Sequence, residues 1–192
     1  LPKDEFVQNP IKKYKGMRIL KQDPWECLIS FICSSVSNIK RISKNIEDLC
    51  INLGNNIHLG SYSRQSFPTP QDIIYSGPDF LRELKLGFRS EYIYQSAKMI
   101  ESGEVNLEEL YSLSYDESLQ TLVSLPGVGD KVANCVLLFA FNKLDAFPVD
   151  VWINRAITRN YLKGEKLPPL HVRNWSRNYF GNYAGYANHY IF

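Results

Sequence analysis

The chain has 192 residues, of which 44% are hydrophobic and 13% aromatic, so it can fill the core of one domain or of two small lobes and is not disordered. Its formal net charge of +2 excludes a histone-like electrostatic grip on nucleic acid, so any DNA binding must depend on a local patch and on backbone amides. The longest apolar run, residues 135–141, is far too short to span a membrane.

Helical periodicity dominates the first half of the chain. Asp23, Pro24 and Glu26 predict the N-cap, the first-turn proline and the capping-box glutamate of a helix that ends near Val36. Farther along, helices are expected over residues 38–53, near 70–85 and over 90–102, with a loop between 54 and 70.

The second half is also helical. Ser114 and Glu117 form another capping box, which opens a helix that reaches Leu125. Further helices are expected over residues 129–141 and 150–162, and two more follow a break at residues 168–169. Strand signals are sparse, so the sequence predicts an all-α fold.

The segment from Leu125 to Lys131 reads Leu-Pro-Gly-Val-Gly-Asp-Lys, which predicts a tight turn between two helices. Its glycines permit positive φ, and the start of the next helix presents unpaired amides that suit a phosphate oxygen. Lys131 lies in the first turn of that helix, where a neutral amine can attack an electrophile. Asp150 follows after one helix and a return segment, which would allow the two side chains to meet. Taken singly, these features also fit a plain helix-turn-helix connection, a surface lysine and a helix N-cap.

The four cysteines form no Cys-x-x-Cys pair and no zinc pattern with the three histidines. They lie among apolar residues, which favours buried, reduced thiols and an intracellular protein. We therefore expect a protein of the cytoplasm and nucleoid, or of the nucleus in a eukaryote, with no membrane association.

Two strings, Leu-Pro-Gly-Val-Gly-Asp-Lys-Val-Ala at residues 125–133 and Phe-Pro-Val-Asp-Val at 147–151, resemble the helix-hairpin-helix DNA glycosylase superfamily. Further strings look like its eukaryotic-type 8-oxoguanine branch, in the same order over nearly the whole chain. They lie at residues 22–27, 31–35, 86–89 and 183–185.

The resemblance implies a two-lobed, all-α fold with a DNA cleft between the lobes. Residues 1–192 would form a single catalytic unit and a monomer. The middle helical lobe would span 37–124, and the second lobe would combine 1–36 with 125–192, including the hairpin at 123–131. The N-terminal sheet domain of this branch does not fit before Gly16, so we expect it to be absent and 8-oxoguanine to be separated from guanine elsewhere or less strictly.

The implied activity is that of a bifunctional DNA glycosylase and AP lyase, which excises 8-oxoguanine from duplex DNA in base excision repair. Lys131 would attack C1′ of the damaged nucleotide, release the base and form a Schiff base, and β-elimination would then nick the strand. Asp150 would steer proton transfer and stabilise the positive charge that builds on the sugar.

Cys135 and Phe192 match residues that sandwich the flipped base, and Asn188 matches the glutamine that reads its Watson–Crick edge. The remaining substrate contacts would come from Phe88 as the wedge in the vacated stack, Arg89 and Arg41 as readers of the orphan cytosine, and Ser37. Such an enzyme must extrude its base, so a wedge, a reader of the widowed partner and an aromatic pocket are all needed.

Backbone contacts to DNA are implied for Gly127, Gly129, Val132 and Trp152. The carbonyls of Val123, Leu125 and Val128 match positions that hold a structural cation beside a phosphate. We expect no organic cofactor, and without clustered cysteines no iron–sulfur cluster.

Two departures affect specificity. Val36 replaces an asparagine that contacts cytosine, which predicts a relaxed choice of the opposite base, and Trp152 replaces a histidine at the DNA backbone. The alternative functions are a sister glycosylase for another damaged purine, a non-catalytic helix-hairpin-helix module that only binds DNA, and a helical interaction protein with no DNA role.

Overall fold

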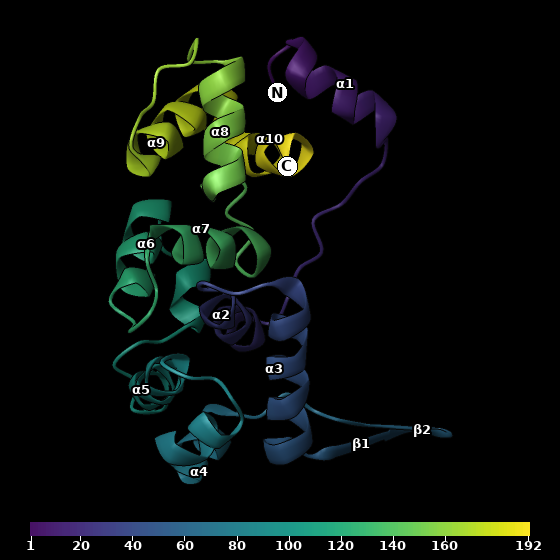
Figure 1. Cartoon of the computed structure of the whole chain (residues 1–192), viewed down its shortest axis with the longest axis vertical. Coiled ribbons are helices and arrows are strands. Elements are labelled where there is room, and N and C mark those ends of the chain that lie inside the picture. The colour runs from purple at the N-terminus through teal and green to yellow at the C-terminus, as the bar shows by residue number, and fades with distance from the viewer.

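Ten α-helices form most of the computed structural model, which describes residues 1–192 (Figure 1). They are α1 (Glu5–Lys13), α2 (Pro24–Cys33), α3 (Ile39–Leu53), α4 (Pro70–Glu83), α5 (Arg89–Glu101), α6 (Tyr115–Val123), α7 (Asp130–Phe139), α8 (Val151–Asn160), α9 (Pro169–Phe180) and α10 (Ala184–Ile191). Two short 3-10 turns lie at Glu108–Tyr111 and Gly181–Tyr183. The all-α prediction is confirmed.

Side-chain caps set where several of these helices begin. Asp23, Asn38, Ser114 and Asp150 each accept a hydrogen bond from a backbone N–H of the first turn, which is one of the groups that a helix start leaves unpaired. The predicted starts of α2, α6 and α8 are therefore confirmed. The predicted end of α2 near Val36 was wrong by three residues: the helix ends at Cys33, and Val36 has a left-handed φ of 49°, which lies outside the right-handed helical region.

The predicted loop over residues 54–70 contains a β-hairpin. Strands β1 (Asn56–Leu59) and β2 (Tyr62–Gln65) pair antiparallel, with Asn56 opposite Gln65, across a two-residue turn that begins with Gly60. Figure 1 shows the hairpin projecting sideways from the end of α3. Every residue of both strands is exposed, so no buried face gives the alternating pattern from which strands are predicted. The sequence pattern also gave no prediction for α1.

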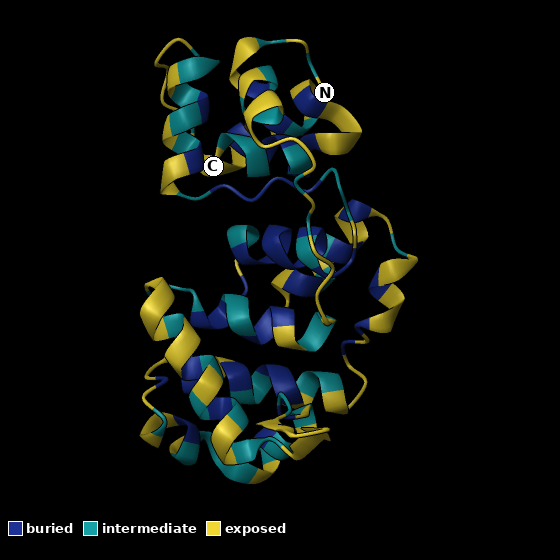
Figure 2. Cartoon of the chain, turned by 90° about the vertical axis from the view of Figure 1, so that its right-hand side faces the viewer, coloured by how far each residue is buried: buried dark blue, intermediate teal, exposed yellow.

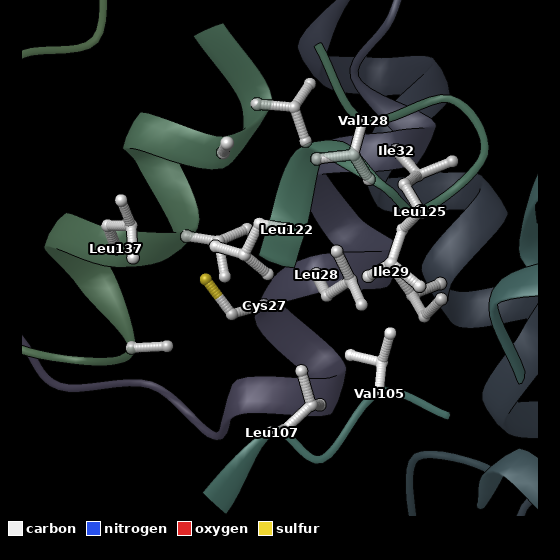
Figure 3. Close-up of a cluster of buried hydrophobic side chains, with 14 of the residues drawn as sticks. Cys27, Leu28, Ile29, Ile32, Val105, Leu107, Leu122, Leu125, Val128 and Leu137 are labelled. Atoms are coloured by element: carbon white, nitrogen blue, oxygen red, sulfur yellow. The ribbon is translucent and has the colours of Figure 1, made fainter. Parts of the chain in front are cut away.

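Two clusters of buried apolar side chains hold the helices together, and Figure 2 shows the buried faces turned inward. The larger contains 26 residues, with α2 at its centre between α3, α5 and α7. Figure 3 shows Leu28, Ile29 and Ile32 of α2 facing Leu122 and Leu125. The smaller cluster has 9 residues and joins α1, α8, α9 and α10. The chain passes from one cluster to the other at Ala146 and Phe147, just before α8.

The turn between α6 and α7 depends on one glycine. Gly127 has a φ of +77°, which L-residues with a side chain rarely adopt. A Cβ built on Gly127 would lie 2.5 Å from the Tyr92 ring, so the turn packs directly against α5. Both the conformation and the lack of a side chain are therefore required there.

Replacing Gly127 by alanine tests this constraint. Gly103 has the same φ of +77°, but a Cβ added to it would meet nothing within 4 Å, so Gly103→Ala measures the backbone term alone, about 1 kcal/mol. We expect Gly127→Ala to lower the free energy of unfolding, measured in urea, by about 2–4 kcal/mol, because the collision with Tyr92 adds to the backbone strain. Equal losses in the two variants would show that Tyr92 does not constrain the turn.

Candidate active site

Lys131 lies at the start of α7, where this helix packs against α2 in the larger cluster. Its Nζ is 3.4 Å from Ser34 Oγ and 5.2 Å from the centroid of the Phe31 ring. Both neighbours belong to the C-terminal end of α2, so packing between α2 and α7 fixes the direction of the lysine. The amine thus lies against an aromatic ring and a hydroxyl.

A cavity of about 260 Å³ opens beside this lysine. It is lined by Phe31, Lys131, Cys135, Phe139, Pro148, Asp150, Ile153, Asn188, His189 and Phe192. The structure therefore brings together five of the residues predicted from the sequence: Lys131, Cys135, Asp150, Asn188 and Phe192. It adds Phe31, Phe139 and His189, which the sequence reasoning missed. Because tertiary packing alone turns these three rings toward the cavity, no local pattern marks them.

The far wall of the cavity comes from the segment before α8 and from α10. Asp150 caps α8, and its Oδ1 accepts the Ile153 N–H at 2.8 Å. The Asn188 Nδ2 donates to the Pro148 carbonyl at 2.7 Å, which anchors α10 to the segment that carries Asp150. Two hydrogen bonds thus hold this wall of the cavity together, the helix cap by Asp150 and the bond from the Asn188 amide to Pro148.

Cys135 forms part of the cavity floor without being a nucleophile. Burial raises the pKa of its thiol to about 11, although the charge of Lys131 and a hydrogen bond from it act in the opposite direction. The thiol is therefore neutral at physiological pH, where only the thiolate attacks readily. The amine of Lys131 also lines this cavity.

The residues expected at the orphaned base lie apart from this cavity. Phe88 is 53% exposed and its ring meets Tyr92 edge-on at 5.8 Å. Arg89 is only 2% exposed, and its guanidinium donates to the backbone carbonyls of Ser35 and Val36. Burial, together with the charge of Arg41, lowers the pKa of Arg89. To reach a base, Arg89 must give up these carbonyls.

The loop that holds Arg89 is strained. Val36 is 90% exposed with a φ of 49°, an unfavourable combination because a β-branched side chain gains no packing there and clashes with its own backbone. The neighbouring Ser37 has a buried Oγ without a hydrogen-bond partner, and Arg41 is exposed on the first turn of α3. Strain and an unsatisfied hydroxyl therefore occur at the same loop, next to the buried arginine.

The buried side-chain amide of Asn134 joins α7, which carries Lys131, to the segment that leads to Asp150. Asn134 Oδ1 accepts the Tyr115 hydroxyl at 2.7 Å and the Phe147 N–H at 3.2 Å. Its Nδ2 donates to the Asp130 carbonyl at 2.8 Å. Arg173 of α9 pairs with the Asp130 carboxylate, yet burial still raises the pKa of that carboxyl, so the ion pair only partly offsets the cost of burying it. The neutral amide is therefore the firmer link.

The turn before α7 offers both free donors and free acceptors. The backbone N–H groups of Gly127, Gly129 and Val132 donate no hydrogen bond within the protein. The carbonyls of Val123 and Val128 accept none, and the Leu125 carbonyl accepts the Val128 N–H at 3.1 Å with a lone pair to spare. These oxygens suit a hard cation, and no group of three His, Cys, Asp or Glu side chains lies where it can hold a metal ion. Trp152, on the first turn of α8, is 67% exposed.

Known families and structures resemble this chain closely. The model of the HhH-GPD superfamily base excision DNA repair proteins matches residues 29–179, most of the chain. The chain belongs to the HhH-GPD superfamily. Residues 1–28 match the model described as the N-terminal domain of 8-oxoguanine DNA glycosylase. The described residues hold no sheet beyond the β1–β2 hairpin, but this match places their start within that domain's sequence.

Relatives within the superfamily share a lyase activity in their names. The chain is 39% identical to the N-glycosylase/DNA lyase of Saccharomyces cerevisiae, over 77% of this chain and 42% of the yeast protein. It is 37% identical to an N-glycosylase/DNA lyase of Arabidopsis thaliana, over 99% of this chain and 55% of the plant protein. The apo structure of Clostridium acetobutylicum 8-oxoguanine glycosylase/lyase superposes with a TM-score of 0.92 at 32% identity, covering 98% of this chain and 66% of that one. The HhH-GPD chain thus spans about two fifths to two thirds of the length of these relatives.

The Asn134 link can be tested by removing it. Asn134→Leu leaves the Tyr115 hydroxyl and the Phe147 N–H buried without an acceptor, and each such group costs about 1–3 kcal/mol. We expect Asn134→Leu to lower the free energy of unfolding, measured in urea, by about 2–5 kcal/mol. The control is Asn52→Leu, because Asn52 is exposed and makes a single hydrogen bond to the Asp48 carbonyl within its own helix. A loss in Asn134→Leu no greater than in the control would contradict a linking role.

Proposed function

We propose that this chain is the catalytic part of a bifunctional DNA glycosylase and AP lyase that excises 8-oxoguanine from duplex DNA. The observation that carries the proposal is the cavity in which Lys131, Asp150, Cys135 and Asn188 meet in an HhH-GPD protein. The activities in the names of the yeast, plant and clostridial relatives support it.

The cavity suits a flipped base. Aromatic rings of Phe31, Phe139 and Phe192 surround it, and stacking a base on such a ring is worth about 1–3 kcal/mol. Because a base inside a duplex is out of reach, the nucleotide must first rotate out of the stack. Cys135, as a neutral thiol, can then lie against one face of the base, and the oxygen of Asn188 remains for its polar edge because the amide nitrogen already binds the Pro148 carbonyl.

The reaction starts with the unprotonated amine of Lys131. Its lone pair forms a bond to C1′ of the nucleotide while the bond between C1′ and N9 breaks, and the base leaves after it gains a proton. Opening of the sugar ring then gives a Schiff base between Nζ and C1′. Loss of a proton from C2′ expels the 3′ phosphate, and water finally releases the lysine. The Asp150 carboxylate stabilises the positive charge on the sugar and moves protons at the ring oxygen.

Contacts to the DNA backbone come from the turn before α7. Free N–H groups of Gly127, Gly129 and Val132 bind a phosphate at the positive end of α7, and Trp152 lies against the strand beside the cavity. The carbonyls of Val123, Leu125 and Val128 would hold a structural cation, whose charge offsets that of the same phosphate.

The partner strand meets a second group of residues. Phe88 is exposed and fills the gap left by the flipped nucleotide, while Arg41 and Ser37 lie near the orphaned base. Arg89 exchanges its bonds to Ser35 and Val36 for the cytosine. Binding therefore includes a rearrangement of the strained loop, and the hydrophobic Val36 in that loop relaxes the choice of the opposite base.

The proposal extends to the organisation of the protein. Residues 1–192 act as one catalytic unit and as a monomer, with DNA across the cleft between the lobe of 37–124 and the lobe of 1–36 with 125–192. The larger buried cluster, which includes side chains of both lobes, supports a single unit. The site of action is where the cell keeps its DNA, the nucleoid of a prokaryote or the nucleus of a eukaryote. None of the helices combines the length and the apolar composition that a membrane span requires.

A glycosylase for another damaged purine is the second candidate. Asn188 is one methylene shorter than glutamine and one of its two amide N–H groups already donates to the Pro148 carbonyl, so fewer groups remain to read the polar edge of the base. Excision from duplexes that carry 8-oxoguanine or alkylated purines, opposite each of the four bases, separates the candidates. Preferential release of an alkylated purine would overturn the substrate proposed here.

Two substitutions separate the proposed roles of the catalytic pair. With Lys131→Gln we expect no borohydride-trapped adduct on 8-oxoguanine duplex, because the amide has no nucleophilic lone pair. With Asp150→Asn we expect excision to slow by roughly 10²–10⁴-fold. Asparagine keeps the N-cap bond to Ile153, so thermal unfolding of that variant should match wild type. Trapping by Lys131→Gln, or wild-type rates in Asp150→Asn, would contradict the mechanism.

A further inference from the structure

A basic surface runs along α8 and the turn that follows it. Residues 151–168 contain four cationic side chains, Arg155, Arg159, Lys163 and Lys166, and one acidic side chain, Glu165. This short segment therefore carries more net positive charge than the whole chain, whose net charge is +2. All four cations are exposed, and we call them the α8 basic surface.

The charges of this surface are not neutralised by the protein. Arg82, Arg173 and Arg177 elsewhere pair with carboxylates, but none of the four cations of the α8 basic surface forms a salt bridge. Arg155 instead lies 5.3 Å from the centroid of the Trp152 ring, and Arg159 donates to the Asn160 side chain. The surface thus retains its positive field for an anionic partner.

The surface is continuous with the base cavity. A hollow of about 310 Å³ beside α8 is lined by Ile153 and Phe192, which also line the base cavity, and by Arg155 and Arg159. Arg155 and Arg159 line in turn a shallower hollow of about 770 Å³ that reaches Lys163 and Lys166. Figure 1 shows α8 running away from α7 toward the end of the molecule. A strand whose base occupies the cavity would therefore pass along this helix.

The dimensions of α8 agree with a DNA backbone. From Trp152 to Arg159 the helix rises about 10 Å, at ~1.5 Å per residue. Phosphates of one strand repeat about every 3.4 Å along a duplex axis, so this length covers roughly three phosphates. Trp152, Arg155 and Arg159 are all exposed and project at intervals of three and four residues, which places them on one face of the helix.

We propose that the α8 basic surface binds the sugar–phosphate backbone of duplex DNA on one side of the flipped nucleotide. It forms a second backbone contact, separate from the free amides before α7. The inference rests on the proposed function in that the flipped base fixes where the strand leaves the cavity. The charges bind phosphates with no sequence preference, because no groove-reading arrangement accompanies them.

Salt dependence of binding gives the first test. The probe is a duplex with a tetrahydrofuran abasic analogue, which no lyase can cleave, and affinity is measured over a series of salt concentrations. Each phosphate contact contributes about −0.9 to the slope of log K against log salt, so Arg155→Gln with Arg159→Gln should make the slope less negative by about 2. Lys98→Gln is the control, because Lys98 is exposed at the far end of α5 and lies over Tyr94, and it should leave the slope unchanged.

Shortening the duplex gives the second test. Wild type should lose affinity when base pairs are removed from one flank of the abasic analogue but not from the other, and the double variant should no longer distinguish the flanks. Thermal unfolding checks that the double variant is folded. An unchanged salt slope in the folded double variant, or an equal change in Lys98→Gln, would overturn the proposal. A separate experiment tests the proposed function: if the wild-type protein forms no borohydride-trapped adduct with 8-oxoguanine DNA, the proposed function is wrong.

Discussion

The site depends on one buried amide. Asn134 has no solvent exposure, and two hydrogen bonds to its Oδ1 join α7, which carries Lys131, to α6 and to the segment that leads to Asp150. That segment is also where the chain leaves the larger buried cluster for the smaller one. The proposed nucleophile, Lys131, and the Asp150 carboxylate therefore keep a fixed relation although they belong to different packing units. Because the link is neutral, it avoids the desolvation cost that the neighbouring pair of Asp130 and Arg173 carries.

With a net charge of only +2, the chain has no strong general positive field, so the proposed DNA contacts have to be local. The free amides lie at the start of α7, which carries Lys131 of the base cavity, and the cations lie along α8, which carries Ile153 of the same cavity. The proposed contacts are therefore concentrated around the nucleotide that would react. The loop of Val36 has a different property. The buried guanidinium of Arg89 donates to the carbonyls of its strained backbone, so in the proposed complex this loop is the part of the site with most to gain from rearranging.

Local chemistry explains which features could be predicted from the sequence. Asp23, Ser114 and Asp150 identify their helices because a cap acts within one turn of itself. The β1–β2 hairpin was missed because strands exposed on both faces have no alternating pattern. Lys131 and Asp150 could be paired only through resemblance, since spacing does not show how a chain returns. The burial of Arg89 and the inward turn of Phe31 depend on contacts between distant helices, which no local pattern contains.

In the proposed reaction, the amine of Lys131 becomes covalently attached to the sugar of the damaged nucleotide. The bond can be located by mass spectrometry of the complex after reduction with borohydride and proteolytic digestion. The nucleotide remnant should be found on the peptide that contains Lys131, at the lysine itself, because this amine alone among those of the chain lines the base cavity. A remnant on another lysine, or on the amine of Leu1, would contradict the role proposed for Lys131.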